Sequence, residues 1–73
     1  MPLVHIDLLE GRSQDKIAAM IESVSAAIAG SLETNIESVR IVVNEMKPYQ
    51  YGVGGKPWPV VAEERRQAQE AGQ

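Results

Sequence analysis

The chain has 73 residues, of which 44% are apolar and 23% are charged. This length allows one small domain and excludes a two-domain enzyme, and the apolar content excludes an intrinsically disordered protein. The net charge of −3 provides no overall basic field that would attract nucleic acid or an anionic membrane surface.

A domain this short is difficult to stabilise alone, and such domains usually depend on disulfides, a metal ion or partner subunits. The sequence has no cysteine and a single histidine, His5, so subunit association is the expected means of stabilisation. It has no apolar run of the ~20 residues that span a bilayer, and it lacks the basic start and apolar stretch of a signal peptide. We therefore expect a cytoplasmic oligomer that contacts neither membrane nor nucleic acid.

The first predicted element is a strand over residues 3–9, because apolar side chains alternate there and Val4, Ile6 and Leu8 share one face. A helix of roughly five turns follows, with Ser13 as its N-cap. Its apolar residues recur at three- and four-residue spacing: Ile17, Met20, Ile21, Val24, Ile28 and Leu32. Beyond it, Asn35 is expected to take the left-handed conformation.

A second strand is predicted from Val39 to Val43, continuing to Met46, because the segment is rich in β-branched residues. Its apolar side chains point to both faces, so both faces are expected to be buried. Strand, helix and strand form a βαβ unit with parallel strands, in the α+β class. One helix covers only one face of the pair, so the other face requires another copy of the chain.

The C-terminal part begins with the glycine-rich residues 51–55, which are suited to a short hairpin or turn. We interpret residues 1–55 as one domain and residues 56–73 as an extension. The composition of the extension permits either a short helix or a partly disordered tail.

A metal or cofactor site is not expected. One histidine with scattered carboxylates does not make the clustered ligand set of a metal site. His5 also lacks the serine or cysteine partner of a nucleophilic triad, so a structural or interface role is favoured for it.

Pro2 is the unusual feature of the sequence, because the initiator methionine is commonly removed before a small residue. Removal leaves a secondary amine, rigidly oriented at the start of a strand and suited to act as a base in an apolar pocket with cationic neighbours. The alternative is that Pro2 only begins an edge strand. On a chain that retains Met1, the nitrogen of Pro2 is a tertiary amide and accepts no proton.

Arg12 and Arg40 are the candidate anion-binding residues. Arg40 lies in an otherwise apolar strand, where a charge is costly unless it is paired or meets a ligand. Two guanidinium groups near a base would form a pocket for a dianionic or keto-acid substrate. The alternative is a structural salt bridge, for example from Arg40 to Glu37 or Glu45 of another subunit.

Four sequence segments occur in a characteristic order over residues 2–55. They are Met1-Pro2, Leu9-Glu10-Gly11-Arg12-Ser13, Ser38-Val39-Arg40 running to Glu45-Met46, and Tyr51-Gly52-Val53-Gly54-Gly55. Together they resemble the short-chain 4-oxalocrotonate tautomerases of the tautomerase superfamily. The resemblance implies a βαβ subunit and a homohexamer, arranged as a trimer of dimers, whose contacts would cover the open sheet face.

The same resemblance implies a role for each candidate residue. Pro2 would be the general base, Arg12 would hold the distal carboxylate, and Arg40 of a neighbouring subunit would hold the 2-oxo or 2-hydroxy acid end. Tyr51 would form an apolar wall where the family commonly has phenylalanine or tryptophan, and the backbone amide of Leu9 is a further candidate contact. The implied function is a cofactor-free isomerase of small anionic keto or enol acids such as 2-hydroxymuconate.

Two other functions stay open at this point. The first is a superfamily hydratase or dehalogenase, in which the amine works as an acid and Glu10 or Glu45 activates water. The second is a non-catalytic, oligomeric ligand-binding subunit, which is favoured if Met1 is retained. No motif assigns a role to Trp58 or to the Arg65-Arg66 pair.

Overall fold

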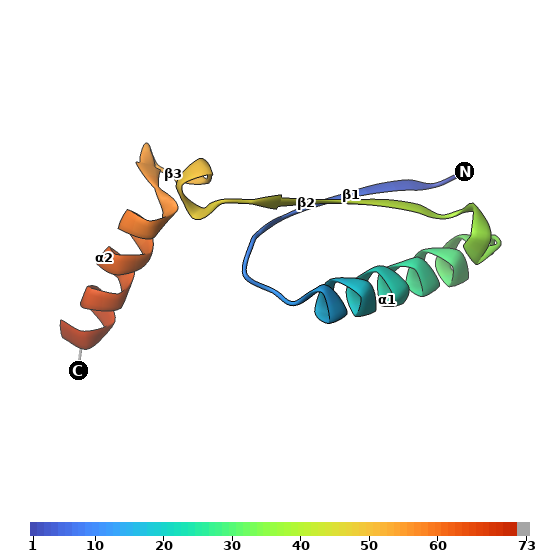
Figure 1. The fold of residues 1–73 in the computed structure, drawn as a ribbon, viewed down its shortest axis with the longest axis horizontal. Coiled ribbons are helices and arrows are strands. Elements are labelled where there is room, and N and C mark those ends of the chain that lie inside the picture. Colours follow the sequence, from blue (N-terminus) through green and yellow to red (C-terminus); the bar gives the residue numbers. More distant parts are fainter. Residues whose placement is uncertain (72–73) are drawn as a thin grey trace.

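The computed structural model describes residues 1–71 and contains one βαβ unit followed by a hairpin and a second helix (Figure 1). The elements in chain order are β1 (Leu3–Leu9), α1 (Gln14–Leu32), the 3-10 turn η1 (Ile36–Ser38), β2 (Arg40–Met46), the 3-10 turn η2 (Pro48–Gln50), β3 (Gly52–Val53), β4 (Lys56–Pro57) and α2 (Trp58–Ala71). The predicted fold class is therefore confirmed.

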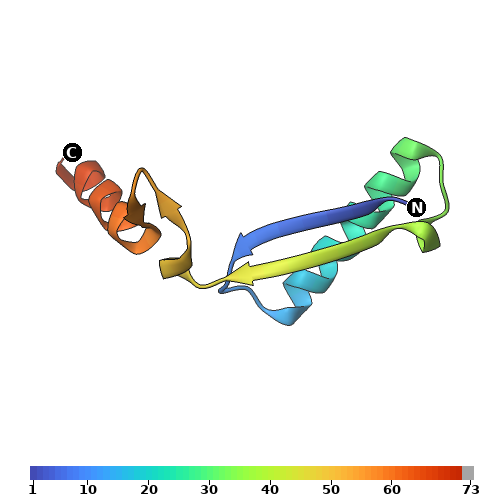
Figure 2. The same cartoon turned by 90° about the horizontal axis from the view of Figure 1, so that it is seen from above.

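β1 and β2 form a parallel pair, in which Leu3 is opposite Arg40 and Leu9 is opposite Met46. β1 has the predicted bounds, and β2 begins one residue later than predicted. The long connection through α1 is what parallel pairing requires, because a tight turn can join only antiparallel strands. Figure 2 shows the two strands side by side, with α1 across one face.

The ends of α1 are fixed by local hydrogen bonds. At its start, the Ser13 hydroxyl accepts a hydrogen bond from the backbone N–H of Lys16 (3.2 Å), as expected of an N-cap. At its end, Glu33 takes the left-handed conformation (φ 53°), and the N–H of Thr34 donates to the carbonyl of Ala29 (3.0 Å). These features define a Schellman motif directly after Leu32. The expectation that Asn35 adopts this conformation is therefore wrong.

The two faces of the β1–β2 pair differ in exposure. On the face toward α1, the apolar strand residues are half-buried, and Ile17 of the helix is 8% exposed. On the opposite face, Val42 is 45% exposed and lies beside His5. Within the described part of the chain, the apolar side chain of Val42 is therefore only partly buried.

The hairpin joins η2 to α2. β3 and β4 are antiparallel, with Val53 opposite Lys56, and the turn between them has positive φ at Gly54 (61°) and Gly55 (86°). Two successive residues with positive φ define a type I′ turn, which favours glycine and matches the twist of a hairpin. The predicted hairpin is confirmed.

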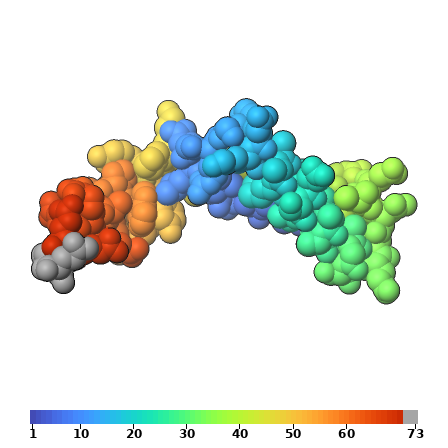
Figure 3. All heavy atoms as spheres, turned by 90° about the horizontal axis from the view of Figure 1, so that it is seen from below, coloured from blue at the N-terminus to red at the C-terminus, as the bar shows by residue number. Residues whose placement is uncertain are grey.

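α2 lies beyond the carboxyl ends of β1 and β2, apart from α1, so the molecule is elongated (Figures 1 and 3). Its extents are 50 × 26 × 23 Å, and its radius of gyration is 16.9 Å. A compact chain of this length would have a radius of gyration of about 11 Å. The single chain therefore does not close around one core, which favours association with other chains.

Ion pairs join exposed side chains along α2, and one of them links α2 to β4. Lys56 pairs with Glu64 (2.8 Å), and Arg66 pairs with both Glu63 and Glu70. The hydrogen bond from Arg66 lowers the pKa of Glu63, and the same bond raises the pKa of Arg66. Within residues 1–71, neither helix is both long enough and apolar enough to cross a membrane.

Candidate active site

Pro2 and Arg40 lie at the same end of the sheet. The backbone N–H of Arg40 donates to the carbonyl of Pro2 (2.9 Å), which continues the pairing of the two strands by one step. The Arg40 guanidinium donates to the backbone carbonyl of Glu37 (2.6 Å) and forms no ion pair within the described chain. No carboxylate of the described chain therefore neutralises its charge.

Arg12 and Leu9 lie at the opposite end of the sheet. Arg12 Nη1 donates to the backbone carbonyl of Leu9 (2.9 Å), and the N–H of Glu10 donates to the carbonyl of Met46 (2.8 Å). These bonds fix the loop that leads into α1. Gly11 permits the turn because it adopts a φ of 131°.

The predicted site residues thus form two groups within one chain. Pro2 and Arg40 are one group, and Leu9, Arg12 and Tyr51 are at the other end of β1 and β2. A strand rises about 3.3 Å per residue, so the seven residues of β1 separate the two groups by about 20 Å. A small acid cannot touch both groups of one chain at once.

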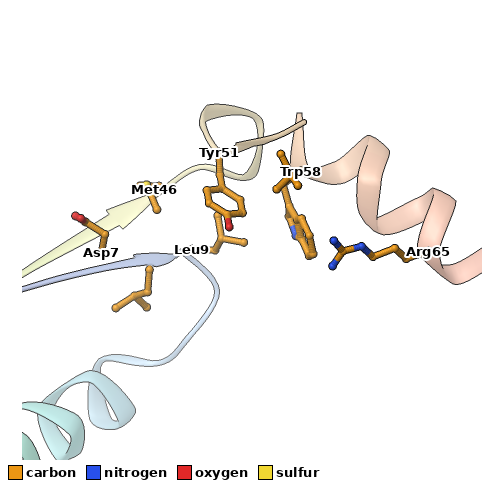
Figure 4. A pocket seen from close by; sticks show the side chains of 8 residues that line it. Asp7, Leu9, Met46, Tyr51, Trp58 and Arg65 are labelled. Atoms are coloured by element: carbon orange, nitrogen blue, oxygen red, sulfur yellow. The ribbon is translucent and has the colours of Figure 1, made fainter. Parts of the chain in front are cut away.

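A hollow of about 450 Å³ lies at the second end, a size suited to a small-molecule ligand. It lies between the carboxyl ends of the two strands, the hairpin and α2 (Figure 4). Its lining consists of Asp7, Leu8, Leu9, Met46, Tyr51, Val53, Trp58 and Arg65. Two predicted substrate contacts, Leu9 and Tyr51, are among them.

The aromatic wall of this hollow contains two rings. The centroids of Tyr51 and Trp58 are 5.9 Å apart, with an interplanar angle of 60°. The backbone N–H of Trp58 donates to the carbonyl of Tyr51 (2.7 Å), which fixes the start of α2 against the wall. On its other side the Trp58 ring meets Arg65, whose Cζ is 5.5 Å from the ring centroid.

Trp58 and Arg65 are site residues that the motifs do not identify. Their spacing contains a signal, because residues seven apart lie on the same side of a helix after two turns. This spacing identifies the pair only if the extension is helical from Trp58 onward. The sequence did not decide between a helix and a disordered tail.

The carboxylates near the hollow differ from those considered for a hydratase. Glu10 and Glu45 are exposed and are not among the lining residues. Asp7 does line the hollow, and its Oδ1 accepts a hydrogen bond from Asn44 Nδ2 (3.2 Å). Over residues 1–71, no three histidine, cysteine or carboxylate side chains gather where they could hold a metal ion.

Comparison with known proteins identifies the family of the chain. A family model described as "Tautomerase enzyme" matches residues 2–59. The 2-hydroxymuconate tautomerase of Pseudomonas putida is 40% identical over 57 residues, which are 78% of this chain and 90% of that protein.

Solved structures of relatives share the fold. TomN, a 4-oxalocrotonate tautomerase homologue in the tomaymycin biosynthetic pathway, has a TM-score of 0.78 and 42% identity, covering 89% of this chain and 95% of TomN. A heterohexamer 4-oxalocrotonate tautomerase from Chloroflexus aurantiacus has a TM-score of 0.77 and 34% identity, covering 81% of this chain and 95% of that one.

These matches define an enzyme of the isomerase class. The chain belongs to the tautomerase family, and the resemblance seen in its sequence motifs is confirmed.

Proposed function

We propose that this protein is a cofactor-free isomerase that interconverts the enol and keto forms of unsaturated 2-keto or dicarboxylic acids, with Pro2 as the general base. Family membership supports tautomerase chemistry in general. A substrate of the 2-hydroxymuconate type is supported by the name of the Pseudomonas putida relative. The observation that carries the proposal is the placement of Pro2 at one end of the sheet and of Leu9, Arg12 and Tyr51 at the other.

The two groups would meet when two chains associate. In a two-fold dimer the same surface of each chain makes the contact. If the β1–β2 pairs of two chains run in opposite directions, the Pro2 end of one chain lies beside the Leu9 end of the other. This contact would also cover Val42, which is 45% exposed in the single chain.

The assembly that we propose is a homohexamer formed by three such dimers. The family resemblance assigns the Arg40 of each site to a third chain, so the Arg40 that lies beside Pro2 in the same chain would serve a neighbouring site. The relative from Chloroflexus aurantiacus is a heterohexamer, so a mixed assembly is the alternative. Native mass spectrometry of protein from its natural source counts the chains and shows whether they are identical.

The reaction balances without a cofactor. The free amine of Pro2 takes the proton of the enol hydroxyl, and the oxygen becomes a carbonyl as electron density moves along the conjugated chain. The far carbon then takes the proton back from the Pro2 ammonium. Arg40 stabilises the negative charge on the enolate oxygen, and Arg12 attracts electron density toward the distal carboxylate.

Removal of Met1 is a condition of this mechanism, because the Pro2 nitrogen is otherwise an amide. The Met1 residue is 85% exposed, so it is accessible to an aminopeptidase. An intact-mass measurement on protein from its natural source should give a chain lighter by one methionine. A chain that retains Met1 would instead support the ligand-binding subunit.

The proposal is tested by following the ultraviolet absorbance of 2-hydroxymuconate with purified methionine-free protein. Pro2→Ala, which is processed in the same way, should lower kcat/KM by at least about 100-fold, because the freely rotating primary amine of alanine is a poorly oriented base in place of the rigid proline amine. Arg40→Ala should lower kcat/KM by about 100- to 1,000-fold. Arg66→Ala is the matched control, since its partners Glu63 and Glu70 lie outside the hollow.

Unchanged kcat/KM in both the Pro2 and the Arg40 variants would contradict the proposal. Halide release from a haloacrylate, without enol turnover, would instead indicate the hydratase or dehalogenase. In that case Asp7, the carboxylate that lines the hollow, is the residue to replace.

A further inference from the structure

Arg65 is a cationic group of the hollow that lies beyond the residues matched by the family model. It extends from α2 across the Trp58 ring, with its Cζ 5.5 Å from the ring centroid (Figure 4). Among residues 1–71 no carboxylate pairs with Arg65. The next residue, Arg66, has both Glu63 and Glu70 as partners, so the two neighbouring arginines have different surroundings.

Contact with the indole orients Arg65 and leaves donors available to a ligand. A guanidinium is attracted to the face of an aromatic ring, and its five N–H donors lie in its own plane. A carboxylate can accept two of these donors side by side. Arg12 is bonded to the Leu9 carbonyl and does not line the hollow, so Arg65 is the arginine that does.

We propose that Arg65 is a specificity-determining residue, which binds a second acidic group of the substrate while Trp58 and Tyr51 contact the flat conjugated part. This inference rests on the proposed function and adds to it a contact made by α2, so that the distal carboxylate is bound by Arg65 as well as by Arg12. The preferred substrate is then an acid with a carboxylate at each end of a planar, unsaturated chain.

The charged side chains that line the hollow favour one orientation of such a substrate. Its carboxylate is at the strand side of the hollow and is held by Asn44, whereas Arg65 is on the helix side. A negatively charged group is repelled at the first position and attracted at the second. The distal carboxylate therefore lies on the side of α2, away from Asp7.

The test compares two unreactive ligands that differ only at the distal end. Hexa-2,4-dienedioate has a carboxylate there, and hexa-2,4-dienoate has a methyl group. Trp58 is the sole tryptophan, so quenching of its fluorescence reports binding directly in the hollow. The wild-type assembly should bind the dianion about five- to tenfold more tightly, as expected of a partly exposed, charge-assisted contact.

Arg65→Gln keeps a polar side chain but removes the charge. It should reduce this preference to less than about twofold and leave the affinity for the monoanion unchanged. Arg66→Gln should retain the wild-type preference, since Arg66 is outside the hollow. An unchanged preference in Arg65→Gln would overturn the proposal, and so would equal loss of affinity for both ligands.

Two further measurements separate this inference from the proposed function. If Arg65→Gln changes the number of chains seen by native mass spectrometry, Arg65 is an interface residue and the inference fails. If the wild type isomerises the enol but binds neither ligand, the inference fails and the isomerase stands. If the dianion preference depends on Arg65 but Pro2→Ala turns over normally, the proposed function fails and the role of Arg65 in binding stands.

Discussion

At the scale of the residue, two kinds of position differ in how well the sequence predicts them. Pro2, Arg12 and Arg40 were identified because each is chemically unusual where it stands. Arg40, for example, interrupts an apolar strand, and the structure gives its guanidinium only backbone partners within the described chain. Their assignment to catalysis stays a prediction.

Trp58 and Arg65 could not be assigned in the same way. No sequence motif includes either residue. The two form a candidate site only as a pair, because they lie two helical turns apart on the same side of α2. Their contact depends on where α2 begins, and the backbone bond from Trp58 to Tyr51 fixes that point. This bond joins Trp58 of α2 to Tyr51, which lies between η2 and β3, so periodicity within one element does not reveal it.

Tyr51 provides a prediction at this scale. Its hydroxyl makes no hydrogen bond within residues 1–71, whereas its ring contacts Trp58 in the aromatic wall. Tyr51→Phe should therefore change kcat/KM by less than about threefold, because it keeps the apolar contact and removes only an unused polar group. Tyr51→Ala is the matched variant and should lower kcat/KM well beyond that. A large loss in Tyr51→Phe, measured by enol decay, would assign a direct role to the hydroxyl.

At the scale of the element, the sequence predicted β1, α1, β2 and the hairpin, because each has a strong local signal. Alternation specifies β1, and two glycines permit the type I′ turn. The left-handed residue after α1 was predicted wrongly as Asn35, because Glu33 has no special tendency toward positive φ. The Schellman bond from Thr34 to Ala29 stabilises this conformation, and such a bond is not visible in residue type. The division of the chain at residue 55 stays a prediction.

Ser13 tests the account of α1. Its hydroxyl is the acceptor for the Lys16 N–H, so Ser13→Ala should lower the free energy of unfolding by about 1 kcal/mol. Ser23→Ala, at an exposed position within α1, is the control and should have little effect, since alanine is a good helix former. Denaturant unfolding at a fixed protein concentration measures both, because assembly makes stability depend on concentration. Equal effects in the two variants would contradict the capping role.

At the scale of the whole molecule, the single chain is incomplete in two respects. Its radius of gyration of 16.9 Å shows that its elements do not surround a common core, and one face of its sheet leaves Val42 exposed. Its candidate catalytic residues also lie at opposite ends of that sheet. The proposed association of chains in opposite directions would account for both features.

Complementation between two inactive variants tests this account most directly. Pro2→Ala and Arg12→Ala chains are each prepared alone, unfolded together in equal amounts and refolded, and enol decay is then followed. If one site takes Pro2 from one chain and Arg12 from another, about a quarter of the sites in a random mixture contain both native residues. The mixture is therefore expected to recover about a quarter of wild-type activity. Activity that stays at the level of the two separate variants would contradict it.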